Sequence, residues 1–157
     1  MANYVISEDI GITNRQEIVR LINDLNAGID TDITISHNQG GNALLAVDLS
    51  SAILNSSAKT INVTAEAFVA SAAAFVIISL LLYRNTNVTL IFNKPVAVMY
   101  HRPRIDNADT GLSYFDVNSS VCTEYDKIMF ALKNTYNVSY NDLKAYYSNH
   151  EFFTVLS

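Results

Sequence analysis

Apolar residues in the first part of the chain recur with two different periods. Short β-branched or aromatic runs at Tyr4–Ile6, Ile33–Ser36 and Thr60–Thr64 are typical of strands. Between them, Thr13–Asn26 and Asn42–Ser56 carry apolar side chains at helical spacing. The order strand, helix, strand, helix, strand predicts right-handed βαβ crossovers and an α/β domain with a mostly parallel sheet.

The most apolar run of the chain is EAFVASAAAFVIISLLLY, residues 66–83. Its apolar part is at the short limit for a membrane span, and it contains Ser71 and Ser79. A helix that is apolar on every side can equally be the central helix of a packed domain. We favour the buried helix, because a span would leave the rest of the chain without a helix for its core. Ser71 is then expected about one turn into this helix.

Two more strands and two helices are predicted after the apolar run. Asn87–Phe92 and Val96–Tyr100 are read as strands of a hairpin around a turn at Asn93–Pro95. Val121–Tyr136 has apolar residues along one helical face, and Tyr140–Tyr147 is a short helix that begins near Ser139.

Two short motifs refine the N-terminal elements. Thr13 is followed three residues later by Gln16, which resembles a helix-capping box. Residues 37–41, HNQGG, are read as a turn after the strand that ends at Ser36, because asparagine and glycine favour turns.

Composition narrows the classes of partner. Half of the 157 residues are hydrophobic and only 16% are charged, which favours a domain that hides part of its surface in an oligomer. The net charge of −5, without a Lys/Arg cluster, argues against nucleic acid. Cys122 is the single cysteine, and no metal-binding Cys/His spacing occurs, so no cofactor is expected. The N-terminus does not resemble a signal peptide, so the cytosol of a cell, or of a virus-infected cell, is the expected compartment.

Three features stand at the ends of predicted strands, where α/β proteins place ligands. They are Gly40-Gly41, Ser71 near a helix N-terminus, and His101. Paired glycines let backbone N–H groups approach a ligand, and a helix N-terminus favours an anion. Each feature alone also has a plain structural reading, as a turn, a packing serine or an exposed histidine.

Together, and in this order, the three features resemble the proteolytic subunit of the Clp protease, the ClpP family. The family pattern reads roughly NSPGG, AASMGAF and VMIHQP, and the matching stretches are HNQGG (37–41), VASAAAF (69–75) and VMYHRP (98–103). The interval from Gly41 to Ser71 is close to that of the family, and the interval from Ser71 to His101 is a few residues longer. The resemblance covers nearly the whole chain and implies one domain, residues 1–157, of ClpP/crotonase-type repeated βαβ units with a C-terminal handle-like helix.

The resemblance also implies chemistry. Ser71 would be the nucleophile of a serine peptidase that acts on peptides or unfolded protein, and His101 would be its general base. The backbone N–H groups of Gly41 and Ala72 would form the oxyanion hole.

The third member of the catalytic set is where the chain departs from the family. Asn149 aligns with the aspartate that orients the histidine. Asparagine can orient an imidazole but cannot stabilise the imidazolium with a charge. Glu151, or an aspartate such as Asp106, could serve instead, and Asn149 could merely cap a helix end.

Two further functions remain open at this point. The chain could be a catalytically weak or inactive ClpP-fold subunit with a structural or regulatory role, or a crotonase-type enzyme acting on an acyl-CoA. Paired catalytic carboxylates typical of the latter are not evident. The helix Val121–Tyr136 lies where the family has its handle helix, so the resemblance implies self-association into rings through its apolar face. The alternative is that this face packs on the sheet of its own subunit. It also implies a possible AAA+ unfoldase or host ClpP as a partner, and no membrane.

Overall fold

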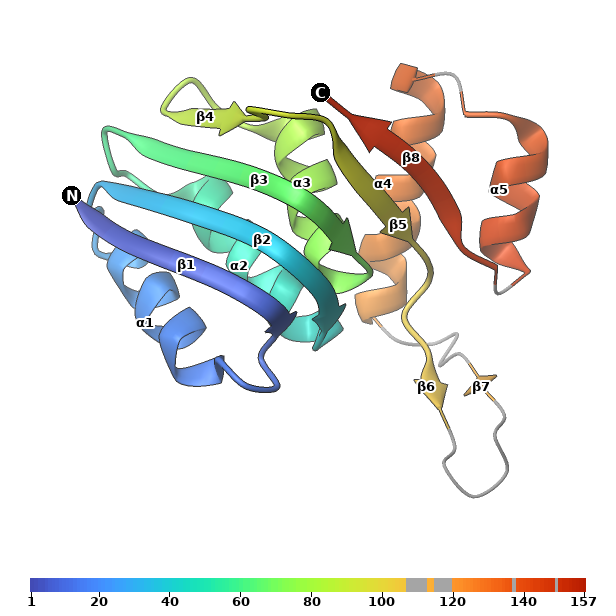
Figure 1. Cartoon of the computed structure of the whole chain (residues 1–157), viewed down its shortest axis with the longest axis horizontal. Coiled ribbons are helices and arrows are strands. Elements are labelled where there is room, and N and C mark those ends of the chain that lie inside the picture. Colours follow the sequence, from blue (N-terminus) through green and yellow to red (C-terminus); the bar gives the residue numbers. More distant parts are fainter. Residues whose placement is uncertain (107–112, 115–119, 137, 149) are drawn as a thin grey trace.

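The computed structural model describes residues 1–106, 113–114, 120–136, 138–148 and 150–157. Its main feature is a six-stranded sheet in the order β1-β2-β3-β5-β8, with β4 also paired to β3 (Figure 1). The strands are β1 (Ala2–Ile10), β2 (Thr31–Gly41), β3 (Ile61–Ala70), β4 (Val88–Ile91), β5 (Val96–Tyr100) and β8 (Phe152–Leu156). The short strands β6 (Ile105–Asp106) and β7 (Ser113–Tyr114) form a separate two-stranded antiparallel sheet.

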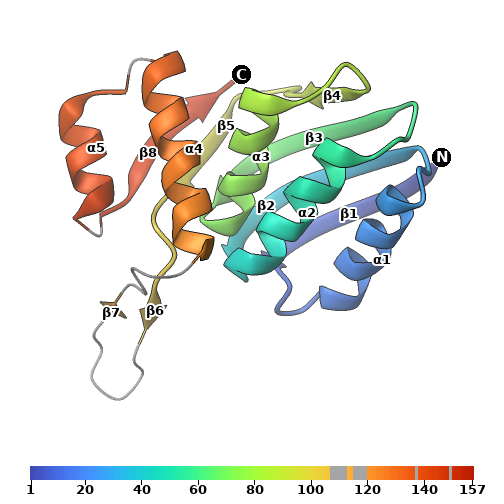
Figure 2. The same ribbon diagram turned by 180° about the vertical axis from the view of Figure 1, so that it is seen from behind.

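Helices cover one face of the main sheet, as Figure 2 shows from behind. They are α1 (Arg15–Asn26), α2 (Ala43–Asn55), α3 (Ala72–Tyr83), α4 (Ser120–Tyr136) and α5 (Tyr140–Tyr147). Strands β1, β2, β3 and β5 are parallel neighbours, and β8 adds to β5 in the antiparallel sense. The predicted α/β class with a mostly parallel sheet is confirmed. The strand β8 was not predicted.

The predicted hairpin at residues 87–100 is wrong. Strand β4 pairs in parallel with the first part of β3, from Ile61 to Thr64, and β5 pairs in parallel with its last part, from Phe68 to Ala70. The two strands therefore follow one another along the same side of β3. Pro95, which has no backbone N–H to donate, lies in the break between them.

The boundary between β3 and α3 also differs from the prediction. Strand β3 continues through the alanine-rich segment to Ala70, because Val69 and Ala70 pair with Val98 and Met99 of β5. The helix begins only at Ala72. Ser71 is therefore the residue at the strand–helix junction, not a residue one turn inside the helix.

Residues 37–41 are not a free turn but the irregular end of β2. The register slips at Glu8 in β1 and at His37 in β2, and Ala67 lies at the matching level of β3. These three residues have positive φ angles of 71°, 46° and 61°. A β-bulge bends the strand that carries it, and bulges are enriched at sheet edges and next to active sites.

The capping box predicted at Thr13 is absent from the structure. The N-cap of α1 is Asn14, and the Thr13 hydroxyl donates instead to the Asp9 carboxylate at 2.8 Å. Asp9 is 2% exposed and also accepts from the backbone N–H groups of Ile12 and Thr13. Burial is the largest single effect and raises the pKa of Asp9, but the hydrogen bonds together outweigh it, so the pKa lies below its ordinary value. Asp9 thus closes the loop from β1 to α1.

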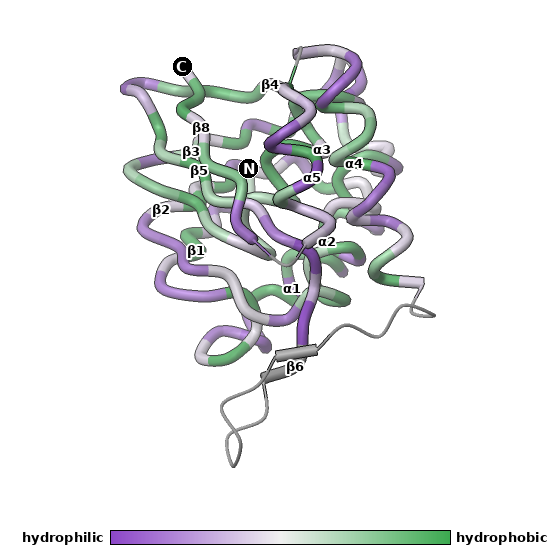
Figure 3. Tube along the Cα trace, turned by 90° about the vertical axis from the view of Figure 1, so that its right-hand side faces the viewer, coloured by the Kyte–Doolittle hydropathy of each residue, from purple (hydrophilic) through white to green (hydrophobic). Residues whose placement is uncertain are grey.

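The apolar run forms the centre of the core. Every residue of α3 from Ala72 to Leu80 is buried, and Figure 3 colours this helix as hydrophobic along most of its length. No helix in the described part of the chain is long and apolar enough to cross a membrane.

The apolar face of α4 is buried within the same chain. The residues on this face are Tyr125, Ile128, Met129 and Leu132, none of them more than 6% exposed. The helix packs on α3 (Figure 2). The prediction that this face forms a ring interface is therefore wrong, because the core of the subunit already covers it.

Candidate active site

The residues singled out in the sequence lie at the carboxyl ends of neighbouring parallel strands. Gly40-Gly41 ends β2, Ser71 follows β3, and His101 follows β5 (Figure 1). Ala70 pairs with Met99, and the Ser71 N–H donates to the Met99 carbonyl at 2.7 Å. The backbone of Ser71 is thus bound to the strand that ends one residue before His101.

The backbone of Ser71 is strained. Its φ of 55° and ψ of −119° are rare for a residue with a side chain. Such conformations cost on the order of 1–3 kcal/mol and persist where surrounding structure enforces them. A sharp strand–turn–helix junction of this kind also exposes the nucleophile in α/β-hydrolases. Ser71, which is partly buried and makes no side-chain cap bond, has the setting of a presented serine.

Gly40 lies directly against this junction. A Cβ atom at Gly40 would come within 2.6 Å of the Ala70 carbonyl oxygen, 2.7 Å of Ser71 Cβ and 2.8 Å of the Ala72 nitrogen. Its φ of 91° also favours glycine. Of the paired glycines in the sequence motif, Gly40 is therefore the one that lies against the start of α3. Gly41 itself faces β1, opposite Ile10.

Asn38 holds the end of β2 beside Gly40, a role that the sequence patterns did not predict. The side chain is fully buried; its amide donates to the Asp9 carbonyl at 2.8 Å, and its oxygen accepts from the Gly40 N–H at 2.9 Å. Asparagine two residues before glycine is a known turn former, so the sequence did carry a signal. Asn38 thereby ties the Gly40 turn to the end of β1.

The His101 ring has a defined tautomer. Its Nδ1 lies 2.6 Å from the carbonyl oxygen of Arg102, which can only accept, so Nδ1 carries the proton. In the neutral ring Nε2 is then the nitrogen that carries no proton, the form that a general base requires. The Arg102 carbonyl therefore contacts the ring nitrogen to which the aspartate binds in a Ser–His–Asp triad.

The three candidates for the third catalytic residue differ in where they lie. Asn149 lies outside the residues that the structure describes, and Asp106 lies in β6. Glu151 forms an ion pair with Arg104 at 3.3 Å. The pKa of Glu151 is lowered by its own backbone N–H, by Arg104 and also by His101. Glu151 is therefore the described carboxylate within electrostatic reach of the imidazole.

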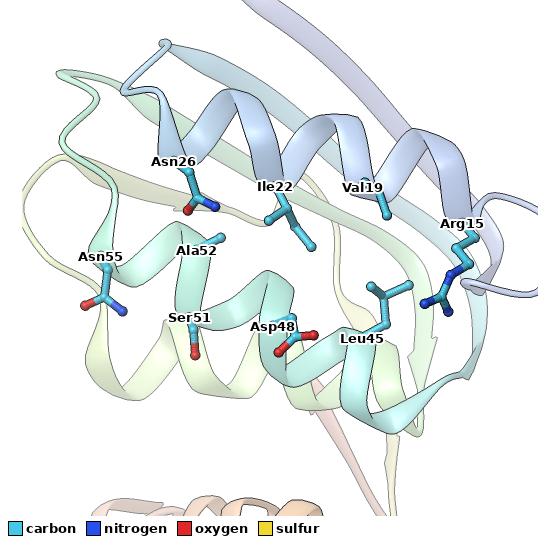
Figure 4. A pocket seen from close by; sticks show the side chains of 9 residues that line it. All are labelled: Arg15, Val19, Ile22, Asn26, Leu45, Asp48, Ser51, Ala52 and Asn55. Carbon is cyan, nitrogen blue, oxygen red and sulfur yellow. The ribbon is translucent and has the colours of Figure 1, made fainter.

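A separate groove on the helical face of the sheet lacks the histidine of a nucleophile–base pair such as Ser71 and His101. It measures about 460 Å³ and lies between α1 and α2 (Figure 4). Its lining residues are Arg15, Val19, Ile22, Asn26, Leu45, Asp48, Ser51, Ala52 and Asn55, without a histidine or cysteine. Among the residues that can be described, no cluster of three or more His, Cys, Asp or Glu side chains could hold a metal ion.

A ClpP-like fold is the class that this arrangement defines, and solved structures support it. ClpP1 from Listeria monocytogenes, in an asparagine-to-aspartate mutant, is similar with a TM-score of 0.59 and 17% identity, covering 97% of this chain and 81% of that one. The ClpP protease catalytic domain from Plasmodium falciparum gives a TM-score of 0.58 and 14% identity, covering 96% and 77%. Neither the models of protein families nor the curated protein sequences give a match. At these identities the likeness establishes the fold.

Proposed function

We propose that the protein is a ClpP-like serine peptidase that hydrolyses peptides or unfolded protein. The observation that carries the proposal is the strained Ser71, bound through its N–H to the strand that leads to His101. The ClpP-like fold and the tautomer of His101 add support. Ser71 is the nucleophile, His101 the general base, and Asn149 the candidate third member.

The reaction follows the acyl-enzyme path of serine hydrolases. Ser71 Oγ attacks the carbonyl carbon of the scissile amide, and its proton passes to His101 Nε2. The N–H groups of Gly41 and Ala72 stabilise the oxyanion. His101 gives the proton to the leaving amine as the C–N bond breaks. Water then attacks the ester with His101 as base, which releases the acid and restores Ser71.

The second candidate function is a weak or inactive ClpP-fold subunit with a structural or regulatory role. It is favoured by the neutral carbonyl at His101 Nδ1, because a carbonyl stabilises the imidazolium less than a carboxylate does. A fluorophosphonate probe separates the two functions, since only an activated serine is labelled.

Restoring a carboxylate at position 149 tests the third member. If Asn149 lies beside His101, Asn149→Asp should raise kcat about tenfold or more, because it adds a charge that stabilises the imidazolium. Peptide hydrolysis is measured against Asn134→Asp on α4 as a control for added charge. No gain from Asn149→Asp, together with a loss from Glu151→Gln, would assign the role to Glu151.

We also expect self-association. The low charged fraction leaves little polar cover, and the apolar side chains of Phe153 and Val155 on β8 are 71% and 64% exposed. Since the α4 face is buried, a ring must use other surfaces. Light scattering at micromolar concentration should give the mass of a closed oligomer. A monomer would contradict this, and a monomer that assembles only when a ClpP is added would favour the regulatory subunit.

A further inference from the structure

Both chain neighbours of His101 are anchored to the C-terminal helices. Before it, Tyr100 is fully buried and donates its hydroxyl proton to the Tyr125 carbonyl of α4 at 2.8 Å. After it, Arg102 donates from Nε and Nη2 to the two carboxylate oxygens of Asp126, also of α4, at 2.9 Å each. The segment that carries the base is thus held on both sides.

An aromatic stack joins this segment to the helix that follows Ser71. Tyr100 stacks between Tyr125 and Tyr146, with ring planes within 4° and 2° of parallel. Tyr125 stacks in turn on Phe75 of α3, with the ring centroids 4.2 Å apart. The Phe75 N–H donates to the Ser71 carbonyl. Packed aromatic rings therefore fix the position of the strand end before His101 relative to the first turn of α3.

Asp126 is where the remaining contacts meet. Besides the two hydrogen bonds from Arg102, its Oδ1 accepts from the Tyr146 hydroxyl at 2.9 Å. The Arg102 side chain is only 12% exposed and lies over the ring of Tyr147, 5.5 Å from its centroid. A bidentate pair of this kind fixes direction as well as distance. Hydrogen bonding to the Asp126 carboxylate also raises the pKa of Arg102.

We propose that Asp126 is a positioning residue for His101. By fixing Arg102 it holds the Arg102 carbonyl 2.6 Å from Nδ1, which keeps the proton on Nδ1 and leaves Nε2 as the base. Asp126 lies on α4, and through Arg102 and the main chain it supports the tautomer with the proton on Nδ1. The effect on catalysis rests on the proposed function, whereas the effect on the ring does not.

The ring is tested without any activity. In the full chain labelled with 15N-histidine, nitrogen chemical shifts report the tautomer, and His101→Gln assigns the signal among the three histidines. Wild type should show Nδ1–H in the neutral ring, and Asp126→Asn should shift it toward Nε2–H. Glu124→Gln, the corresponding carboxylate-to-amide change at a half-exposed side chain of α4, should leave the tautomer as in wild type. An Nε2–H ring in the wild type, or an unchanged tautomer in Asp126→Asn, would overturn the proposal.

Turnover supplies the second readout. Asp126→Asn should lower kcat roughly tenfold to a hundredfold with little change in KM, since a displaced base costs rate rather than binding. Tyr146→Phe removes one hydrogen bond and keeps the stack, so it should show a smaller loss of the same kind and serves if Asp126→Asn does not fold. A rise in KM with unchanged kcat would overturn the positioning role. A wild type that hydrolyses nothing would refute the proposed function, while the NMR result would still decide on Asp126.

Discussion

Ser71→Ala should abolish peptide hydrolysis while leaving the fold intact. The change removes only a hydroxyl that makes no cap bond, and alanine fits the space because it is smaller. Loss of a nucleophile or base in a serine protease lowers kcat by up to roughly 10⁶-fold. His101→Ala should be nearly as damaging, because nucleophile and base act as a unit. Initial rates on a fluorogenic peptide, with circular dichroism to confirm folding, measure the effect.

Two further variants sharpen this test. Ser79→Ala, in the same helix, removes a hydroxyl that donates only to the Phe75 carbonyl and should keep full activity. The double variant of Ser71→Ala and His101→Ala should be no slower than either single one. Losses that simply add, or activity that survives Ser71→Ala, would show that the two residues do not form one catalytic unit.

Gly40→Ala should disrupt both stability and activity. The positive φ costs alanine about 1–3 kcal/mol. The new Cβ also meets three atoms at 2.6–2.8 Å: the Ala70 oxygen, the Ala72 nitrogen and Ser71 Cβ. Because two of these atoms are backbone, the end of β2 must move away from α3, at a further cost of about 1–3 kcal/mol. Denaturant unfolding measures the free energy, and peptide hydrolysis should fall at least a hundredfold.

Gly28→Ala is the matched control. Gly28 also has a positive φ, of 73°, but a Cβ there meets the Ser57 hydroxyl oxygen, which can rotate away. The Gly28→Ala variant should therefore lose only the unfolding free energy that the positive φ costs alanine. Its activity per folded molecule should equal that of wild type. Equal losses of stability and activity in both variants would show that contact with the Ser71 junction is not what makes Gly40 important.

The elements that the sequence predicted well are those fixed by local interactions. The helix predicted at Asn42–Ser56 is α2, with Asn42 as an N-cap whose side chain accepts from the Leu45 N–H. The helix predicted at Val121–Tyr136 is α4, extended by one residue. In both, apolar residues at helical spacing determine the buried face, so a local pattern is enough.

The errors lie where pairing partners are far apart in the sequence. The segment from Glu66 to Ala70 is strand because it pairs with β2 and β5, although its alanines and the run that follows favour helix. The hairpin fails for the same reason, since β4 and β5 each find β3 rather than each other. Side-chain propensity cannot anticipate which strand supplies the partner.

The candidate site was predictable to the extent that it sits at strand ends. Glycines, a serine and a histidine after parallel strands were expected to meet, and Gly40 does contact Ser71. The support of His101 was not predictable in this way. It depends on Arg102 reaching Asp126 and on tyrosines from β5, α4 and α5 stacking together, which only the packed chain determines.

The proposed peptidase function requires that Ser71 is an activated nucleophile. Incubation of the folded protein with a fluorophosphonate, followed by intact-mass and peptide mass spectrometry, tests it most directly. We expect one phosphonyl group per chain, on Ser71, and almost none in His101→Ala, where the base is missing. A wild-type protein that stays unlabelled, or that is labelled on another residue, would contradict it.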